Sequence, residues 1–168
     1  FIGLYSKYKF LTTNYGLKHI NNFFSIRPSY IYGHRQRKGT LIDLLLKSIK
    51  LKKEIKMTNC KIYRDYIFVE DVASAFYEIT FSNAPAGIYN VGSGKLITLK
   101  KLIKEITKKS NFNSKYLEFG KLVNKEKNQP KSFMITKKIK RYSSWSLINT
   151  LEDGIIKILK YHKINYNN

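Results

Sequence analysis

The alternation of strand-like and helix-like segments is the feature that most restricts how this chain can fold. Hydrophobic periodicity separates short apolar runs from amphipathic stretches, and the two types follow one another along the chain. Strands are predicted over 19–26, 62–69, 88–91 and 116–119. Helices are predicted over 5–15 and from Thr40, Asp71, Thr98 and Thr150 onward. Because alternating strands and helices pack as helices against a mostly parallel sheet, the sequence predicts an α/β fold.

The ends and inner faces of the predicted elements follow from individual residues. Gly16 is expected to end the first helix, and Pro28 to close the strand after it. Thr40, Asp71 and Thr98 are candidate N-caps, and the last helix is expected to start at Thr150. The later helices each have an apolar stripe predicted to face the core: Leu41, Leu44, Leu45 and Ile49; Val72, Phe76 and Ile79; Leu99, Leu102, Ile103 and Ile106; Leu151, Ile155 and Leu159.

The composition excludes several classes of protein. A length of 168 residues suits one domain. A single cysteine, Cys60, excludes an intrachain disulfide framework and, with three scattered histidines, a Cys/His zinc site, so no metal is expected. The apolar runs are too short to cross a membrane, and no signal peptide is recognised, so cytoplasm is the expected compartment. The first residue is Phe1 rather than Met, which we interpret as a processed or partial chain.

The chain is strongly basic, with 32 Lys and Arg against 11 Asp and Glu and a formal net charge of +21. Nucleic acid, an anionic membrane surface or a phosphate-bearing small molecule could each explain this charge. A basic nucleic-acid-binding protein is one hypothesis. However, the sequence shows no RNA-recognition sheet pattern, no zinc ligands and no clear helix-turn-helix, so nucleic acid is the less favoured partner.

One pair of side chains on the first predicted helix has the spacing for acid–base chemistry. Tyr5 and Lys9 are four residues apart, so they lie on one face of a helix. A nearby ammonium group favours the phenolate form of a tyrosine, which can exchange protons with a sugar hydroxyl. The same spacing also arises by chance in a chain with 13 tyrosines and many lysines.

Five blocks of sequence resemble one known family in order and approximate spacing. These blocks are Tyr-Ser-Lys-Tyr-Lys at 5–9, Ile-Arg-Pro-Ser-Tyr-Ile-Tyr-Gly at 26–33, Arg-Asp-Tyr-Ile-Phe-Val-Glu-Asp-Val at 64–72, Gly-Ile-Tyr-Asn-Val-Gly-Ser-Gly at 87–94, and 145–155. They resemble the extended short-chain dehydrogenases, in particular the NAD(P)-dependent enzymes that epimerise, dehydrate or reduce nucleotide-sugars. The blocks at 26–33 and 64–72 are the specific ones.

The resemblance covers only the C-terminal half of such an enzyme. Neither G-x-G-x-x-G nor G-x-x-x-x-G-K-[ST] occurs, and the family's glycine loop for NAD or NADP lies in the N-terminal half. The resemblance therefore implies the C-terminal part of a Rossmann-like parallel sheet plus the smaller substrate-binding α/β domain. Residues 1–35 would be the end of the Rossmann part with the catalytic helix, and 36–168 mainly the nucleotide-sugar-binding portion. The chain by itself is expected to be inactive.

The resemblance also implies roles for individual residues. Tyr5 would be the catalytic acid/base and Lys9 the catalytic lysine that favours the phenolate form of Tyr5. Tyr5, Lys9 and Pro28 would contact the cofactor. Family members usually read Tyr-x-x-Ser-Lys; aligning on Ser6-Lys7 makes Lys7 the alternative lysine and leaves Gly3 in place of the tyrosine. We favour the register with Tyr5 and Lys9, because only that register supplies both residues.

On the substrate side, the resemblance implies three further residues. Arg64 would bind the nucleotide diphosphate, for which a guanidinium fork is suited; its alternative role is a strand-end pair with Asp65. Gln36 and Asn90 would lie beside the nucleotide-sugar, although packing is the other role open to Asn90. A second diphosphate arginine, common in relatives, is missing near 129–130. The complete enzyme could be a homodimer, and the alternative function is a nucleotide-sugar-binding remnant without turnover.

Overall fold

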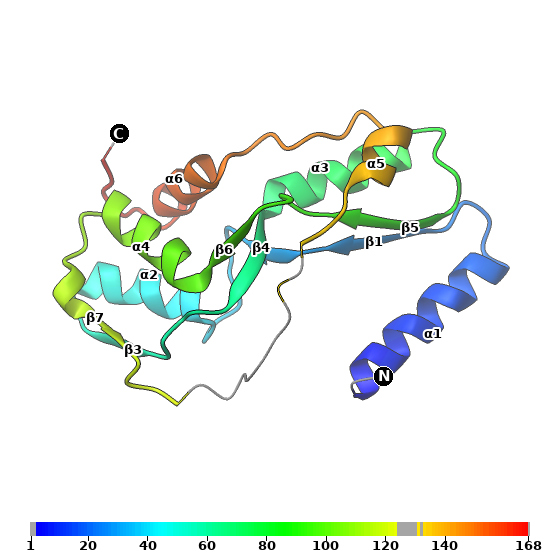
Figure 1. Cartoon of the computed structure of the whole chain (residues 1–168). Helices are drawn as coiled ribbons and strands as arrows, with labels where there is room; N and C mark the ends of the chain where they lie inside the picture. The colour runs from blue at the N-terminus through cyan, green and yellow to red at the C-terminus, as the bar shows by residue number, and fades with distance from the viewer. Residues whose placement is uncertain (1–2, 124–130, 132, 168) are drawn as a thin grey trace.

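The computed structural model describes residues 3–123, 131 and 133–167, and within them the chain alternates strands and helices (Figure 1). The helices are α1 (Leu4–His19), α2 (Leu41–Leu51), α3 (Val69–Thr80), α4 (Leu99–Lys109), the 3₁₀ helix η1 (Ser114–Tyr116), α5 (Lys137–Tyr142) and α6 (Leu151–Tyr161). The strands are β1 (Phe24–Pro28), β2 (Tyr30–Tyr32), β3 (Ile55–Met57), β4 (Tyr63–Phe68), β5 (Gly87–Val91), β6 (Leu96–Thr98) and β7 (Leu117–Phe119). The predicted α/β fold is confirmed.

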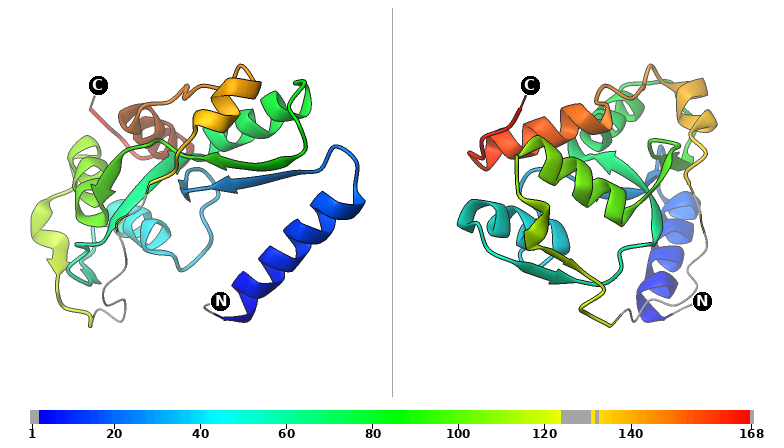
Figure 2. Two further views of the ribbon diagram at one scale, coloured as in Figure 1. Left: turned by 45° about the vertical axis from the view of Figure 1, so that its right-hand side comes forward. Right: turned by 60° about the vertical axis from the view of Figure 1, so that its left-hand side comes forward.

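A parallel pair of strands forms one side of the molecule. β1 and β5 pair from Phe24 opposite Gly87 to Pro28 opposite Val91. Helices α3 and α5 lie on one side of this pair and α1 on the other (Figures 1 and 2). Tyr89 and Trp145 are buried in the core under α3 and α5. The strand that Pro28 closes therefore joins a parallel sheet, as predicted.

A second sheet and three helices form the larger core. Strand β4 pairs in parallel with β2 and antiparallel with β6. Helices α2, α4 and α6 pack there, with Leu45, Leu102, Ile103 and Ile158 fully buried. The short pair β3–β7 lies at the far end of the molecule (Figure 1). Because β5 pairs with β1, the first sheet uses residues from both sides of the expected boundary at 35, and that boundary stays a prediction.

Two threonines cap their helices, Thr98 as predicted and Thr150 at the expected start of the last helix. Thr98 Oγ1 accepts a hydrogen bond from the Lys101 amide at 3.1 Å. At α6, Thr150 and Asp153 form a reciprocal capping box. Thr40 occupies the N-cap position of α2, but its hydroxyl donates to the Arg37 carbonyl instead.

The first helix and strand differ from the prediction. Gly16 lies inside α1, which continues to His19, and the strand begins at Phe24 rather than at residue 19. The ring of Phe23 occupies the space that a Cβ at position 16 would take. Glycine is therefore needed there for packing, not for ending the helix.

Three apolar or capping assignments are also wrong. Phe76 and Leu44 are exposed rather than buried. Asp71 is not an N-cap: Phe68 holds that position, and Asp71 lies in the first turn of α3. None of the helices in the described part of the chain has the length and apolarity needed to cross a bilayer.

Candidate functional site

Helix α1 presents the predicted tyrosine–lysine pair on one face. Lys9 Nζ lies 5.8 Å from the centroid of the Tyr5 ring, as the four-residue spacing predicts. The Tyr5 side chain is largely exposed, so its hydroxyl is accessible.

A hollow of about 760 Å³ separates α1 from strand β1. Tyr5, Ser6 and Lys9 line its helix side, and Pro28 lines it from the carboxyl end of β1. Lys7 is not part of this lining. The structure therefore brings together the three residues expected to contact a cofactor. Ligands of open α/β sheets bind at such strand ends.

The C-terminal half of α1 fixes this arrangement. The hydroxyls of Thr13 and Ser25 are 3.3 Å apart and join the helix to β1. One turn farther on, the missing Cβ of Gly16 lets the ring of Phe23 approach the helix. Thr13 and Gly16 are the two buried residues of α1.

Arg64 is nearly buried on strand β4. Its Nη1 donates to the Tyr63 carbonyl at 2.9 Å, and its guanidinium carbon lies 4.6 Å from the centroid of the Tyr30 ring. The cation–π contact with the Tyr30 ring holds the guanidinium of Arg64 in place beside the sheet.

The other two predicted substrate residues lie elsewhere. Gln36 is half-buried in the turn between Gly33 and Thr40, and Asn90 lies in β5 opposite Arg27 in the strand register. Neither lines the hollow beside α1. Positions 129–130, where the missing second arginine was considered, lie outside the described residues.

Two buried aspartates organise the loops around the strand ends. Asp65 accepts hydrogen bonds from the Ser93 amide and hydroxyl, the Gly94 amide and the Met134 amide, at 2.6–3.1 Å. Asp71 accepts from the amides of Ile148 and Asn149 at 2.7 and 3.1 Å. Neither role is among the predictions made from the sequence. The available signal was the two aspartates of the largely apolar block 64–72, since buried carboxylates need donors.

A charged cluster lies at the start of α3. Glu70 pairs with Lys157 at 2.5 Å and with His34 Nε2 at 3.2 Å. The hydrogen bond from Lys157 lowers the pKa of Glu70, with a smaller contribution from His34. The cluster ties the loop after β2 to α6. No group of three or more metal-ligating side chains is found in the part of the chain described by the structure.

The helices packed around parallel strands make the chain an α/β protein, and comparison with known proteins identifies the family. Residues 8–92 match the model of the NAD dependent epimerase/dehydratase family. The chain is 32% identical over 139 residues to CDP-abequose synthase of Salmonella muenchen, covering 82% of the chain and 47% of that protein. It is 31% identical over 140 residues to dTDP-4-dehydro-6-deoxyglucose reductase of Escherichia coli, covering 81% and 43%. The chain belongs to the NAD dependent epimerase/dehydratase family.

Solved structures show the same fold. UDP-glucose 4-epimerase from Thermotoga maritima, solved with UDP-glucose, superposes with a TM-score of 0.76 at 20% identity over 94% of this chain and 51% of that one. The dTDP-glucose 4,6-dehydratase from Bacillus anthracis, solved with NAD, gives 0.78 at 18% identity over 92% and 49%. The chain thus spans about half the length of the relatives it matches.

Proposed function

We propose that this chain provides the proton-transferring helix and part of the nucleotide-sugar site of an NAD(P)-dependent epimerase, dehydratase or reductase. The observation that best supports this is the shared hollow of Tyr5, Lys9 and Pro28 at the carboxyl end of β1. The relatives named above act on nucleotide-sugars, and the solved neighbours include complexes with NAD and with UDP-glucose.

The residues of the hollow fit a dinucleotide cofactor. Lys9 and the hydroxyl of Tyr5 offer donors suited to ribose hydroxyls, and Pro28 offers an apolar surface for a ring. When bound, NAD or NADP supplies the hydride acceptor and donor for the sugar ring. Tyr5 would hold or release the proton of the sugar hydroxyl at its phenolic oxygen, and Lys9 would favour the phenolate.

The catalytic part of the proposal is tested in a complete enzyme. The chain is joined to an N-terminal half carrying the glycine loop, and turnover of CDP-, UDP- and dTDP-sugars is measured. Tyr5→Phe should lower kcat by about 100-fold or more, the usual effect of losing a positioned proton donor. Lys9→Ala should do comparable damage.

Lys7→Ala is the matched control, because Lys7 lies on the same helix but outside the hollow. It should have a much smaller effect. A severe loss of kcat in Lys7→Ala together with a mild loss in Lys9→Ala would support the alternative register, in which Lys7 is the catalytic lysine. If none of the three substitutions changes the rate of an active enzyme, the catalytic role of α1 is wrong.

The binding part is tested on the 168-residue chain alone. Calorimetric titration with the same nucleotide-sugars should show Arg64→Ala weakening affinity by about 10- to 100-fold, the loss of a charge-assisted contact. Arg141→Ala, an exposed arginine on α5, is the control, and circular dichroism checks folding. Unchanged affinity in Arg64→Ala would exclude the role. Tight binding by the chain together with no turnover in the complete enzyme would indicate a binding remnant.

A further inference from the structure

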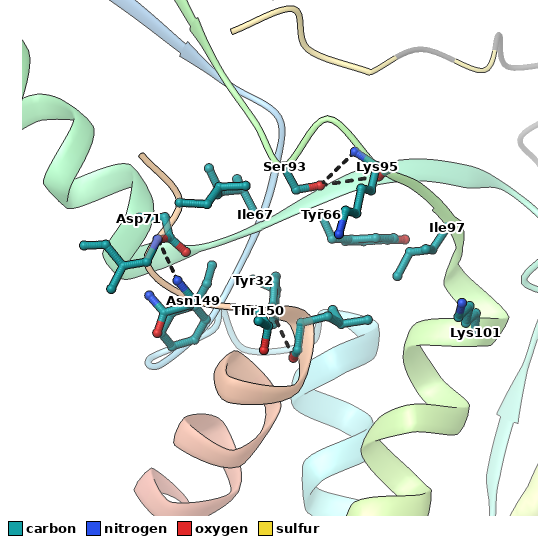
Figure 3. A pocket seen from close by; sticks show the side chains of 14 residues that line it. Tyr32, Tyr66, Ile67, Asp71, Ser93, Lys95, Ile97, Lys101, Asn149 and Thr150 are labelled. Carbon is teal, nitrogen blue, oxygen red and sulfur yellow. Dashed lines mark hydrogen bonds between the residues drawn. The ribbon is translucent and has the colours of Figure 1, made fainter. Parts of the chain in front are cut away.

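Another cavity lies between the β2–β4–β6 sheet and the segment 147–151 that leads into α6 (Figure 3). Its volume is about 340 Å³. None of the residues proposed above for catalysis, cofactor or substrate is found among the described residues that line it. Ligand pockets in proteins span about 300 to 1,000 Å³, so this cavity suits a small ligand rather than a whole nucleotide-sugar.

One end of the cavity has unsatisfied polar groups. Asp71 is fully buried and lines the cavity; its second carboxylate oxygen, Oδ2, has no hydrogen-bond partner among the described residues. The same holds for Nδ2 of Asn149, another residue of the lining. A buried polar atom without a partner costs about 1–3 kcal/mol, so an occupant that pairs with these groups would be favoured. A hydroxyl can donate to a carboxylate and accept from an amide at the same time.

The other end of the cavity is positively charged. Lys95 and Lys101 are exposed, and in the described residues neither ammonium group has an ion-pair partner. Figure 3 shows both lysines on the side of the cavity away from Asp71 and Asn149. Two ammonium groups at the mouth of a partly apolar cavity attract an anion, and phosphate is a common partner of lysine.

The wall between the two ends is apolar. The ring of Tyr66 and the side chain of Ile97 lie there (Figure 3). Such a surface can cover the C–H face of a sugar ring while the hydroxyls at its edge reach polar groups. Burial and the neighbouring charge of Asp71 raise the pKa of Tyr32, which therefore remains a neutral donor to the Leu151 carbonyl.

We propose that this cavity binds a sugar phosphate, with the phosphate at Lys95 and Lys101 and ring hydroxyls at Asp71 and Asn149. This goes beyond the proposed function and does not depend on it. Nucleoside monophosphates also carry a phosphate on a sugar. Their base, however, needs more room than the small volume of this cavity provides.

The single tryptophan offers a direct readout. Trp145 is buried, and its Nε1 donates to the main-chain carbonyl of Asp71 at 3.0 Å. Its fluorescence should change when a ligand occupies the end of the cavity lined by Asp71 and Asn149.

The 168-residue chain is titrated with glucose 1-phosphate, glucose, inorganic phosphate and AMP, and calorimetry measures binding independently of fluorescence. Glucose 1-phosphate should bind at least about tenfold more tightly than each of the others, because glucose and inorganic phosphate each reach one end only and the base of AMP exceeds the cavity.

Three variants locate the site. Lys95→Ala and Lys101→Ala should each weaken glucose 1-phosphate binding by about tenfold, and Asn149→Ala should do the same without affecting inorganic phosphate. Lys104→Ala is the control, because this exposed lysine of α4 lies outside the lining.

Four results would overturn the proposal. These are no saturable binding of glucose 1-phosphate up to about 10 mM, equal losses in Lys104→Ala and the cavity lysine variants, inorganic phosphate binding as tightly as glucose 1-phosphate, and preferential binding of AMP. The last would assign the cavity to nucleotides instead.

Discussion

At the scale of single residues, Asp65 joins three segments that are far apart in the sequence. Its carboxylate accepts hydrogen bonds from Ser93, Gly94 and Met134. Gly92 permits this contact, because a Cβ there would collide with Asp65 Oδ2 and with Met134. The carboxylate thus holds the turn after β5 against the segment before α5.

Replacing this carboxylate by an amide should destabilise the fold. Asp65→Asn places an N–H donor where an acceptor is needed, so the free energy of unfolding should fall by about 3 kcal/mol, the cost of one or two charge-assisted hydrogen bonds. Urea unfolding followed by circular dichroism measures this change. Glu54→Gln, the same exchange at an exposed position, should change stability little. Equal effects of the two substitutions would contradict the role of Asp65.

The Glu70 cluster makes a small contribution to acid stability. Its pKa is lowered in the folded protein, mainly by the Lys157 hydrogen bond, so its stabilisation is present above the ordinary value of 4.5 and is lost as the pH falls through the folded pKa. Glu70→Gln should therefore flatten the loss of stability below pH 4.5. Because the group is partly exposed, the change should be small. A variant with the same acid slope as the parent protein would argue against this contribution.

At the scale of elements, helices α2 and α6 both begin after a threonine, but only the threonine of α6 caps its helix with its side chain. Thr150→Ala removes the capping box of α6 and should lower the free energy of unfolding by about 1 kcal/mol. Thr40→Ala is the matched control, because the Thr40 side chain does not cap the amides of α2. Thermal unfolding of both variants tests this. A larger loss in Thr40→Ala would mean that the capping box adds little.

The sequence predicts elements well where several residues share a pattern. The stripe of Leu102, Ile103 and Ile106 is fully buried in α4, as expected. Strand β7 was predicted, but β2, β3 and β6, which also have three residues each, were not, and neither was α5, because so short a segment shows no reliable period. Gly16 was misinterpreted because the need for its missing Cβ comes from Phe23, outside the helix.

In the candidate site, too, the contacts set by local spacing could be predicted and those between distant residues could not. Tyr5 and Lys9 could be paired from the sequence because their contact depends only on helix spacing. The hydrogen bond from Asn149 to Asp71 joins residues 78 positions apart, and no local pattern indicates it. Pro28, which lines the hollow beside α1, was assigned to the cofactor from the family resemblance and not from the residues themselves; that role stays a prediction.

At the scale of the whole molecule, α1 presents an apolar stripe to solvent. Leu4, Tyr8, Leu11 and Tyr15 recur at intervals of four and three residues, and all are at least 49% exposed. In the described part of the chain, strand β1 pairs with β5 alone, so its second edge is also open. Both features favour association of the 168-residue chain.

Sedimentation velocity at high micromolar concentration should therefore show species larger than a monomer. Leu11→Glu places a charge in the stripe and should shift the distribution toward monomer. Leu51→Glu, at an exposed leucine of α2, is the control and should not. A monodisperse monomer for the unaltered chain would contradict the expectation. If Leu11→Glu leaves the association unchanged, the open edge of β1 rather than the stripe of α1 is its cause.

The parallel pairing of β1 with β5 also has a consequence during synthesis. Phe24 leaves the ribosome well before its partner Gly87, and at roughly 5 to 20 residues per second the delay is on the order of 3 to 13 seconds. During that time β1 has no partner from β5, and the pairing cannot form until α2, β4 and α3 have been made. The nascent chain should therefore bind a chaperone most strongly at lengths that expose 24–28 but not yet 87–91.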